Sequence, residues 1–332
     1  MILTTPLLER LAARGAVDVV ATPASAGLLA NHPAVRDVIV YDKRGADAGV
    51  QGLRRVAARV RATGADTAYL AQGSLRTAAL ARLAGIPERI GFDTSPGRWL
   101  YTQRVRFRRT LHHADRLWLL ATRAGIVEIP PALRPSLFPG AADYAAVDAL
   151  LRANNVSPGA PLIALAPGSV WATKRWPWYD ALARGMLRSP ATRDARIVVL
   201  GAPGDKPLAQ AIAAAVRETG GPDVVDATGM LSLLGSAALL TRVRVLITND
   251  SAPLHLASAM NVPTVALFGP TVPDFGFGPL ASRSEVLGHE LLSCRPCGTH
   301  GPQKCPLGHW RCMRELAVDR VAHAVERIGV EA

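Results

Sequence analysis

The sequence contains no apolar run of roughly 18 residues, the length that a helix needs to cross a bilayer. Its start, Met1 to Pro6, lacks the basic segment and the small-residue cleavage site of a secretion signal. These two absences predict a protein without a transmembrane segment that stays in the cytoplasm.

Aromatic residues are also scarce, at 5% of the chain, and basic residues are not interleaved with them in a recognised nucleic-acid-binding motif. We therefore expect no nucleic-acid partner.

Two nucleotide-binding motifs are also absent. No G-x-G-x-x-G follows a first strand, and no G-x-x-x-x-G-K-[ST] occurs, which disfavours a dinucleotide dehydrogenase and a P-loop enzyme.

Cysteine is rare and confined to one segment: the four cysteines are Cys294, Cys297, Cys305 and Cys312. In a reducing compartment this clustering argues against a disulfide scaffold. The spacing suits a tetrahedral zinc site, built from the four thiolates or from a mixture with His300 and His309. The alternative is a loop of reduced cysteines.

Positive charge, by contrast, is abundant: 38 Lys and Arg against 26 Asp and Glu give a formal net charge of +12. Such a surface attracts phosphorylated substrates, anionic lipid or nucleic acid. Two arginine clusters lie in the first half, Arg54, Arg55, Arg59 and Arg61, and Arg104, Arg106, Arg108 and Arg109. As a set they suit an anionic partner at a membrane surface, whereas any one of them would ordinarily belong to a solvated face.

With 332 residues, 49% of them hydrophobic, the chain is long enough for two domains. The expected strands are Val17–Ala21, Val38–Tyr41, Thr67–Leu70, Arg89–Phe92, Leu162–Ala166, Arg196–Gly201, Val224–Ala227, Val243–Thr248 and Thr264–Phe268. The expected helices are Pro6–Arg14, Ala24–Ala30, Val50–Thr63, Leu75–Ala84, Pro177–Arg188, Lys206–Glu218, Leu231–Leu240 and Pro253–Met260. This alternation predicts an α/β domain with a parallel sheet in each half of the chain.

The polar, turn-rich segment Leu151–Pro161 predicts a linker between the domains. We therefore expect one domain over residues 1–153 and another over residues 160–313, the second ending in the cysteine-rich loop 294–312. Residues 314–332 carry a last helix, Glu315–Val330, as a candidate to cross back to the first domain. Open parallel sheets bind ligands at the carboxyl ends of their strands, so two sheets facing across a cleft would hold one ligand each.

Three strand-to-helix turns in the second half contain the candidate ligand-binding residues. The first, Ala166–Pro177, has a Pro-Gly-Ser turn with free backbone N–H groups and leads into a helix that begins near Pro177. Lys174 and Arg175 place cations where a phosphate would arrive. On these residues alone, an ordinary loop with two solvated basic side chains is an equal alternative.

The second turn, Ile247–Ala259, again enters a helix, which Asp250 or Ser251 would cap. The N–H groups at that helix start would hold a diphosphate, while Asp250 suits sugar hydroxyls better. His255, one turn into the helix, is more often a packed side chain than a ligand contact. In a third turn, Asp205 suits either a ribose diol or the cap of the next helix.

Taken in order, these segments resemble glycosyltransferase family 9, the lipopolysaccharide heptosyltransferases, and most of all the heptosyltransferase II branch. The matching segments of the second half are Pro167–Pro177, Thr248–His255, Val265–Thr271 and Pro273–Phe275. Those of the first half are Ala71–Ser74, Ala84–Phe92 and the pair His113 and Arg116. The likeness covers nearly the whole chain.

The resemblance implies an α/β GT-B fold with two Rossmann-like domains, the first binding the acceptor and the second the nucleotide sugar. It implies an inverting transfer of heptose from ADP-heptose to heptosyl-Kdo-lipid A, an anionic glycolipid at the inner membrane surface, with no required cofactor. The donor residues that it implies are Ser169 and Lys174 for the phosphates, Arg175 beside them, Asp205 for the ribose, Met230 for the adenine, and Asp250, Ser251 and His255 at the helix start. The acceptor residues are Ser74, Arg76, Arg104, His113 and Arg116.

The chain departs from the family pattern at two places. Ala252 stands where the family usually has glycine, and its methyl group either crowds a phosphate or is absorbed by a small shift. Family members also open with a strand ending in Gly-Asp, and that aspartate, the expected general base, would fall immediately before Met1. We interpret the missing strand and aspartate as the result of a mis-assigned start codon. An in-frame stop codon directly upstream would overturn this interpretation. Without that strand, transfer would be severely impaired and a central strand edge would be exposed.

Two other classes of function stay open on the sequence. One is another GT-B glycosyltransferase, or a nucleotide-sugar epimerase, that uses a different sugar; an assay of ADP-heptose against UDP-sugars separates it from heptosyl transfer. The other is a catalytically impaired nucleotide-binding homologue, which ADP binding without turnover would favour.

Overall fold

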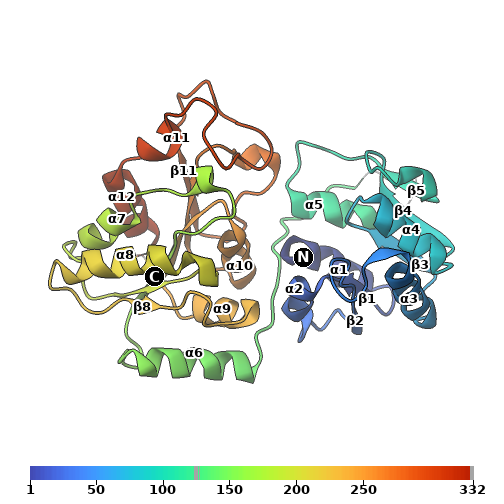
Figure 1. The fold of residues 1–332 in the computed structure, drawn as a ribbon, viewed down its shortest axis with the longest axis horizontal. Coiled ribbons are helices and arrows are strands. Elements are labelled where there is room, and N and C mark those ends of the chain that lie inside the picture. The colour runs from blue at the N-terminus through green and yellow to red at the C-terminus, as the bar shows by residue number, and fades with distance from the viewer. Residues whose placement is uncertain (123–125, 127, 330–332) are drawn as a thin grey trace. The chain divides into compact units, whose positions relative to one another are not determined.

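The structure is a computed structural model that describes residues 1–122, 126 and 128–329. The chain divides into two compact units, Met1–Phe138 and Pro139–Ala332. Every strand pairing described in either unit is parallel, and helices separate the strands along the chain (Figure 1). The predicted α/β class with parallel sheets is therefore confirmed.

The first unit contains short strands and five α-helices in its described part. The strands are β1 (Asp18–Ala21), β2 (Asp37–Val40), β3 (Thr67–Leu70), β4 (Glu88–Phe92) and β5 (Gln103–Val105). The helices are α1 (Thr5–Ala12), α2 (Pro23–Ala26), α3 (Gly49–Ala62), α4 (Leu75–Leu83) and α5 (His113–Trp118). The described strands form two separate sheets, β1-β2 and β3-β4-β5.

Helix α3 shows how the arginine-rich sequence folds. Val56 and Val60, one helical turn apart, are buried against Ile39 of β2 and Leu80 of α4. The arginines of the first predicted cluster lie on the exposed side of this helix. Arg59 there donates a hydrogen bond to the backbone carbonyl of Val40, at 3.0 Å, and so binds the end of β2.

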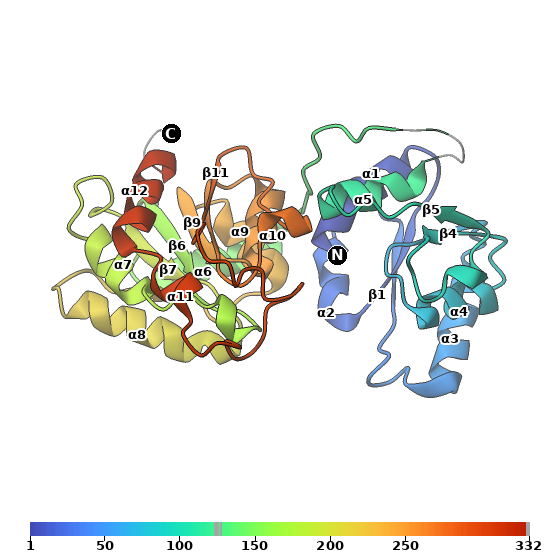
Figure 2. The same ribbon diagram turned by 90° about the horizontal axis from the view of Figure 1, so that it is seen from above.

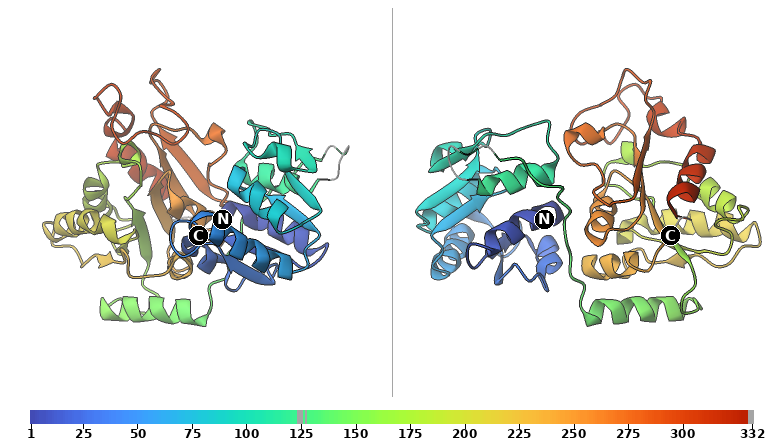
Figure 3. Two further views of the ribbon diagram at one scale, coloured as in Figure 1. Left: turned by 45° about the vertical axis from the view of Figure 1, so that its right-hand side comes forward. Right: turned by 180° about the vertical axis from the view of Figure 1, so that it is seen from behind.

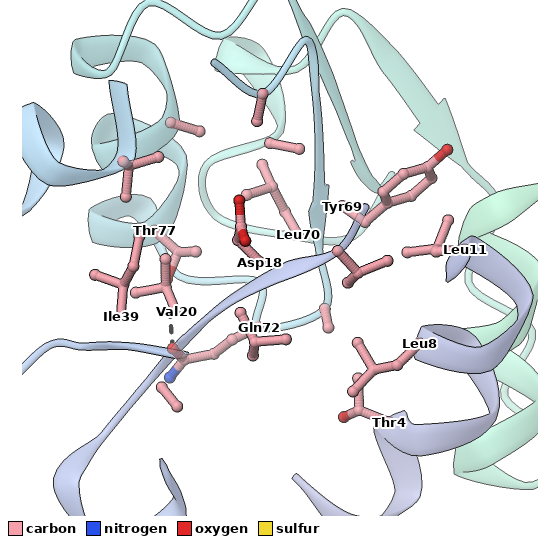
Figure 4. Close-up of a pocket in the computed structure, with 18 of the residues that line it drawn as sticks. Thr4, Leu8, Leu11, Asp18, Val20, Ile39, Tyr69, Leu70, Gln72 and Thr77 are labelled. Carbon is pink, nitrogen blue, oxygen red and sulfur yellow. Dashed lines mark hydrogen bonds between the residues drawn. The ribbon is translucent and has the colours of Figure 1, made fainter. Parts of the chain in front are cut away.

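A cavity of about 920 Å³ is lined by both β1 and β3, the strands that face each other from the two sheets. Helices α1 and α4 also contribute to its wall (Figure 4). Gln72, which follows β3, accepts a hydrogen bond from the Thr77 hydroxyl of α4 at 3.3 Å. In the described residues, no strand hydrogen bonds join β1 to β3.

The second unit has one six-stranded sheet among the described residues, in the order β11-β10-β9-β6-β7-β8. Its strands are β6 (Leu162–Ala166), β7 (Arg196–Val199), β8 (Val225–Asp226), β9 (Val245–Asn249), β10 (Thr264–Phe268) and β11 (Ser284–Gly288). Its α-helices are α6 (Ala141–Ala153), α7 (Tyr179–Met186), α8 (Lys206–Arg217), α9 (Leu233–Leu240), α10 (Ala252–Met260), α11 (Arg311–Arg314) and α12 (Val318–Gly329).

Helices cover both faces of this sheet (Figure 2). On one face Leu165 and Ile247 are buried with Leu182 of α7 and Ile212 of α8. On the other face Phe268 of β10 packs with Leu254 of α10. Strands β6, β9 and β10 are buried at every position, as expected for a parallel sheet covered on both faces.

The division between the units lies earlier than the predicted linker Leu151–Pro161, because α6 lies beside α9 (Figure 3). The Ser232 hydroxyl donates to the Asp143 carboxylate of α6 at 3.0 Å. Helix α12 packs against α7 and the sheet of the second unit, and Val330, the predicted end of the last helix, lies outside the described residues. No helix in the described ranges has the length and apolar character of a membrane span.

Candidate functional site

The candidate site lies at the carboxyl edge of the second sheet, where β6 and β9 are neighbours. Strand β6 starts this unit's sheet, and the chain extends the sheet to β7 and β8 on one side and to β9, β10 and β11 on the other. Ligands of open α/β sheets bind at such a reversal of strand order. The turns after β6 and β9 are the first and second turns singled out in the sequence.

Lys174 and Asp250 form a buried ion pair that joins these two turns. The Lys174 Nζ lies 2.6 Å from Asp250 Oδ2, and the two side chains are only 9% and 10% exposed. The hydroxyl of Thr271, after β10, donates to the same carboxylate oxygen at 2.7 Å. A lysine and a carboxylate taken this far out of water must be held by each other and by further hydrogen bonds. Thr271 lies in a segment that matches the family pattern, but its sequence context alone does not mark it as a site residue.

Asn249, at the end of β9, fastens the first turn at both of its ends. Its amide Nδ2 donates to the carbonyl of Pro167 at 2.8 Å, and its Oδ1 accepts from the backbone N–H of Trp176 at 3.2 Å. The Tyr179 hydroxyl also lies 3.4 Å from Oδ1, and burial raises the pKa of that tyrosine, so it stays a neutral donor. The role of Asn249 is not visible in the sequence, because only the fold shows that this side chain reaches both ends of the turn.

Helix α10 starts at Ala252, directly after the Asp250–Ser251 pair. Ser251 is the N-cap residue but its side chain makes no capping hydrogen bond; its hydroxyl lies 3.5 Å from that of Thr248. The amide-rich, partially positive helix start is therefore available to an anion. Ala252 is exposed at this helix start.

Two of the other predicted donor residues shape the turn after β6. The Ser169 hydroxyl accepts from the N–H of Trp171 at 3.3 Å, and exposed Arg175 donates to the Ser169 carbonyl at 2.9 Å. The Asp205 carboxylate accepts from the N–H of Ala202 at 2.9 Å and lies against Gly168, where a Cβ atom would come within 2.3 Å of Oδ2. Asp205 occupies the N-cap position of α8, but its side chain makes no capping hydrogen bond to that helix and instead lies beside the turn after β6.

Met230 and His255 differ in environment. Met230 is 65% exposed and follows Gly229, whose φ of +69° favours glycine. The imidazole of His255 lies 6.3 Å from the ring of Phe277, which agrees with the packed alternative for this histidine.

The acceptor residues predicted in the first unit are not all in one place. Ser74, Arg76 and His113 line the 920 Å³ cavity, whereas Arg104 and Arg116 do not. Ser74 caps α4 by accepting from the N–H of Thr77 at 3.2 Å, and Arg76 is exposed on the first turn of that helix.

Arg116 is 6% exposed and donates to the backbone carbonyls of Arg108 and Arg109, at 3.0 and 2.6 Å. Exposed Arg104 donates to the carbonyl of Arg98 at 3.2 Å. Burial, followed by the nearby positive charges of Arg116 and His112, lowers the pKa of His113 to about 4. His113 is therefore neutral at pH 7.

The four predicted zinc ligands are free cysteines. Burial raises the pKa of Cys312 to about 11, which disfavours its thiolate. No three Cys, His, Asp or Glu side chains in the described ranges are grouped so that they could hold a metal ion. The predicted four-thiolate set does not fit a metal in this arrangement, so zinc binding stays a prediction.

Comparison with known proteins places these features in a family. A sequence model of glycosyltransferase family 9 (heptosyltransferase) matches residues 53–310. Lipopolysaccharide heptosyltransferase 1 of Pseudomonas aeruginosa is 30% identical over 253 residues, which cover 74% of this chain and 65% of that protein. Lipopolysaccharide heptosyltransferase 2 of Escherichia coli is 27% identical over 302 residues, covering 86% of this chain and 84% of that protein.

The solved structure of the E. coli ADP-heptose lipopolysaccharide heptosyltransferase II is similar to this chain with a TM-score of 0.79 and 25% identity. The match covers 99% of this chain and 94% of that structure.

Proposed function

The chain belongs to glycosyltransferase family 9 (heptosyltransferase) and is a glycosyltransferase, and from this premise we propose that it moves heptose from ADP-heptose to a heptosyl-Kdo-lipid A acceptor. The similar E. coli structure is described as an ADP-heptose heptosyltransferase, which supports this donor. The reaction would belong to lipopolysaccharide core biosynthesis, with the protein in the cytoplasm at the surface of the inner membrane.

One observation carries the proposal: a buried cation lies beside an uncapped helix start at the switch point of a parallel sheet. Lys174 lies on the turn after β6, and α10 begins two residues after its partner Asp250. When the glycosidic bond to the donor breaks, negative charge grows on the departing ADP. A fixed ammonium group and backbone N–H groups aimed at that charge stabilise the transition state more than the ground state.

The remaining donor residues extend the same site. Asp205, beside Gly168, would take the ribose hydroxyls, and exposed Met230 would cover the adenine. Asp250 would orient heptose hydroxyls while it holds Lys174 in place. In this proposal Asp205 and Asp250 bind sugar hydroxyls, and Lys174 binds the phosphates.

On the acceptor side, we propose that Ser74, Arg76, Arg104, His113 and Arg116 belong to the region that receives the anionic glycolipid. The proposed reaction needs no cofactor, and metal analysis of protein purified without a chelator tests the separate prediction of zinc at the cysteines.

The decisive variant is Lys174→Ala, with Lys206→Ala on the exposed start of α8 as the matched control. We expect Lys174→Ala to lower both ADP affinity and turnover of ADP-heptose by about tenfold or more, because it removes the phosphate cation and leaves Asp250 unpaired. Calorimetry with ADP and a coupled assay with ADP-heptose measure the two quantities. Unchanged affinity and turnover in Lys174→Ala would contradict the proposal.

A further inference from the structure

The segment that contains Cys294, Cys297 and Cys305 lies directly against the turn that carries Lys174. It connects β11 to α11, which holds Cys312, and its described residues form no helix or strand (Figure 1). The side-chain amide of Gln303 donates to the carbonyl of Val170 at 2.9 Å and accepts from the N–H of Ala172 at 3.1 Å. One side chain therefore satisfies a donor and an acceptor of this turn, as a neighbouring strand would.

Two more contacts lie next to Lys174. Thr173, which is 3% exposed, donates its hydroxyl hydrogen bond to the carbonyl of Pro302. Gly301 has a φ of +75°, and a Cβ atom there would lie 3.3 Å from the Thr173 hydroxyl and 3.6 Å from the Lys174 Cε. The backbone of the cysteine-rich segment thus packs on the lysine stem itself.

The other end of the segment is fastened to the loop after β10. The guanidinium group of Arg295 donates to the carbonyls of Phe268 and Thr271, at 2.9 and 3.0 Å. The N–H of Cys297 donates to the carbonyl of Pro270 at 2.8 Å. The Thr271 hydroxyl holds the carboxylate partner of Lys174, so the segment is bonded to residues next to both members of the buried ion pair.

We infer that Arg295–Gln303 is a strap that positions the Lys174 turn, and that Gln303 and Thr173 are positioning residues for the donor diphosphate. The inference rests on the proposed function, in which Lys174 meets that diphosphate. Among the described residues, no strand pairs with the turn between β6 and α7, so hydrogen bonds from neighbouring segments limit its conformations before the ligand arrives. A turn that is already ordered loses less conformational entropy when the ligand binds, so the ligand binds more tightly.

The test uses two near-isosteric variants that remove the strap contacts from opposite sides. Gln303→Met removes both amide hydrogen bonds from the strap, and Thr173→Val removes the hydroxyl hydrogen bond from the turn. Gln210→Met, at an exposed position of α8, is the matched control. Hydrogen exchange of residues 170–174 is measured without ligand, together with the dissociation constant for ADP and the KM values for donor and acceptor.

We expect the backbone amides of residues 170–174 to exchange faster in both strap variants. ADP should bind about three- to tenfold more weakly, because each variant loses one or two hydrogen bonds. The donor KM should rise by the same factor while the acceptor KM stays unchanged, a split that general destabilisation would not produce. Gln210→Met should match the wild type in every measurement.

Three outcomes separate the strap from the proposed function. Unchanged exchange and ADP affinity in both variants overturn the strap, even where Lys174→Ala abolishes binding. Faster exchange throughout the second sheet also overturns it, because that result shows general loosening. If the wild-type protein fails to bind ADP, the proposed function fails, and local exchange at residues 170–174 still decides whether the strap orders the turn.

Discussion

Asn249 shows how much a single buried amide can determine at this site. It satisfies the carbonyl of Pro167 and the N–H of Trp176, and it is fully buried. No charge is involved, so its importance depends on geometry alone. The same side chain connects the end of β9 to both ends of the turn after β6.

We predict that Asn249→Ala lowers the free energy of unfolding by about 2–3 kcal/mol, because it leaves buried backbone groups without partners. Urea denaturation followed by circular dichroism measures this loss. ADP affinity should fall as well, since the turn loses its anchor. A variant as stable as the wild type would show that water or a shifted backbone replaces the amide.

His113 makes the stability of the first unit depend on pH. Its folded-state pKa of about 4 lies below the ordinary value of 6.5, so between these pH values the unfolded chain binds a proton that the folded protein does not. Stability attributable to this histidine is therefore constant above pH 6.5 and is lost as the pH falls toward 4.

We predict that His113→Gln reduces this loss of stability. The change in the free energy of unfolding between pH 7.5 and pH 4 should be smaller than in the wild type by up to about 3 kcal/mol. Denaturant unfolding between pH 4 and pH 7.5 measures it. Parallel stability curves for the two proteins would contradict the assignment of the lowered pKa to His113.

At the scale of elements, the two units differ in how their central strands are paired. In the second unit β9 has hydrogen-bonded neighbours on both sides, β6 and β10. In the first unit, the described pairings give β1 the partner β2 and β3 the partner β4, with the cavity against their other edges. Backbone groups on such edges are open to water or to another chain.

We predict that the cavity-side amides of β1 and β3 exchange roughly 100-fold or more faster than the amides of β9 in the protein of residues 1–332. Hydrogen exchange read by mass spectrometry makes this comparison within one molecule. Equally slow exchange would show that something covers these edges in solution.

Elements with strong periodicity were predicted well from the sequence. Strands β3, β6 and β10 have the predicted bounds. Strands β6 and β10 are short runs of buried residues between turn signals, whereas in β3 only Leu70 is buried. Helix α6 was missed, since it is rich in alanine and only Val147 among its residues is buried. Strand β11 was missed because it is a short edge strand in which only Leu287 is buried.

At the scale of the whole molecule, the sequence by itself determined the α/β class, the strand–helix order and the turns that carry Lys174 and Asp250. Those are local properties, since apolar periodicity, proline and glycine act on neighbouring residues. Only the tertiary structure decided that Lys174 pairs with Asp250, 76 residues away, and that Gln303 bonds to the turn at Ala172 from 131 residues away. Such contacts depend on which strands become neighbours, and strand order follows from burying both faces of the sheet together.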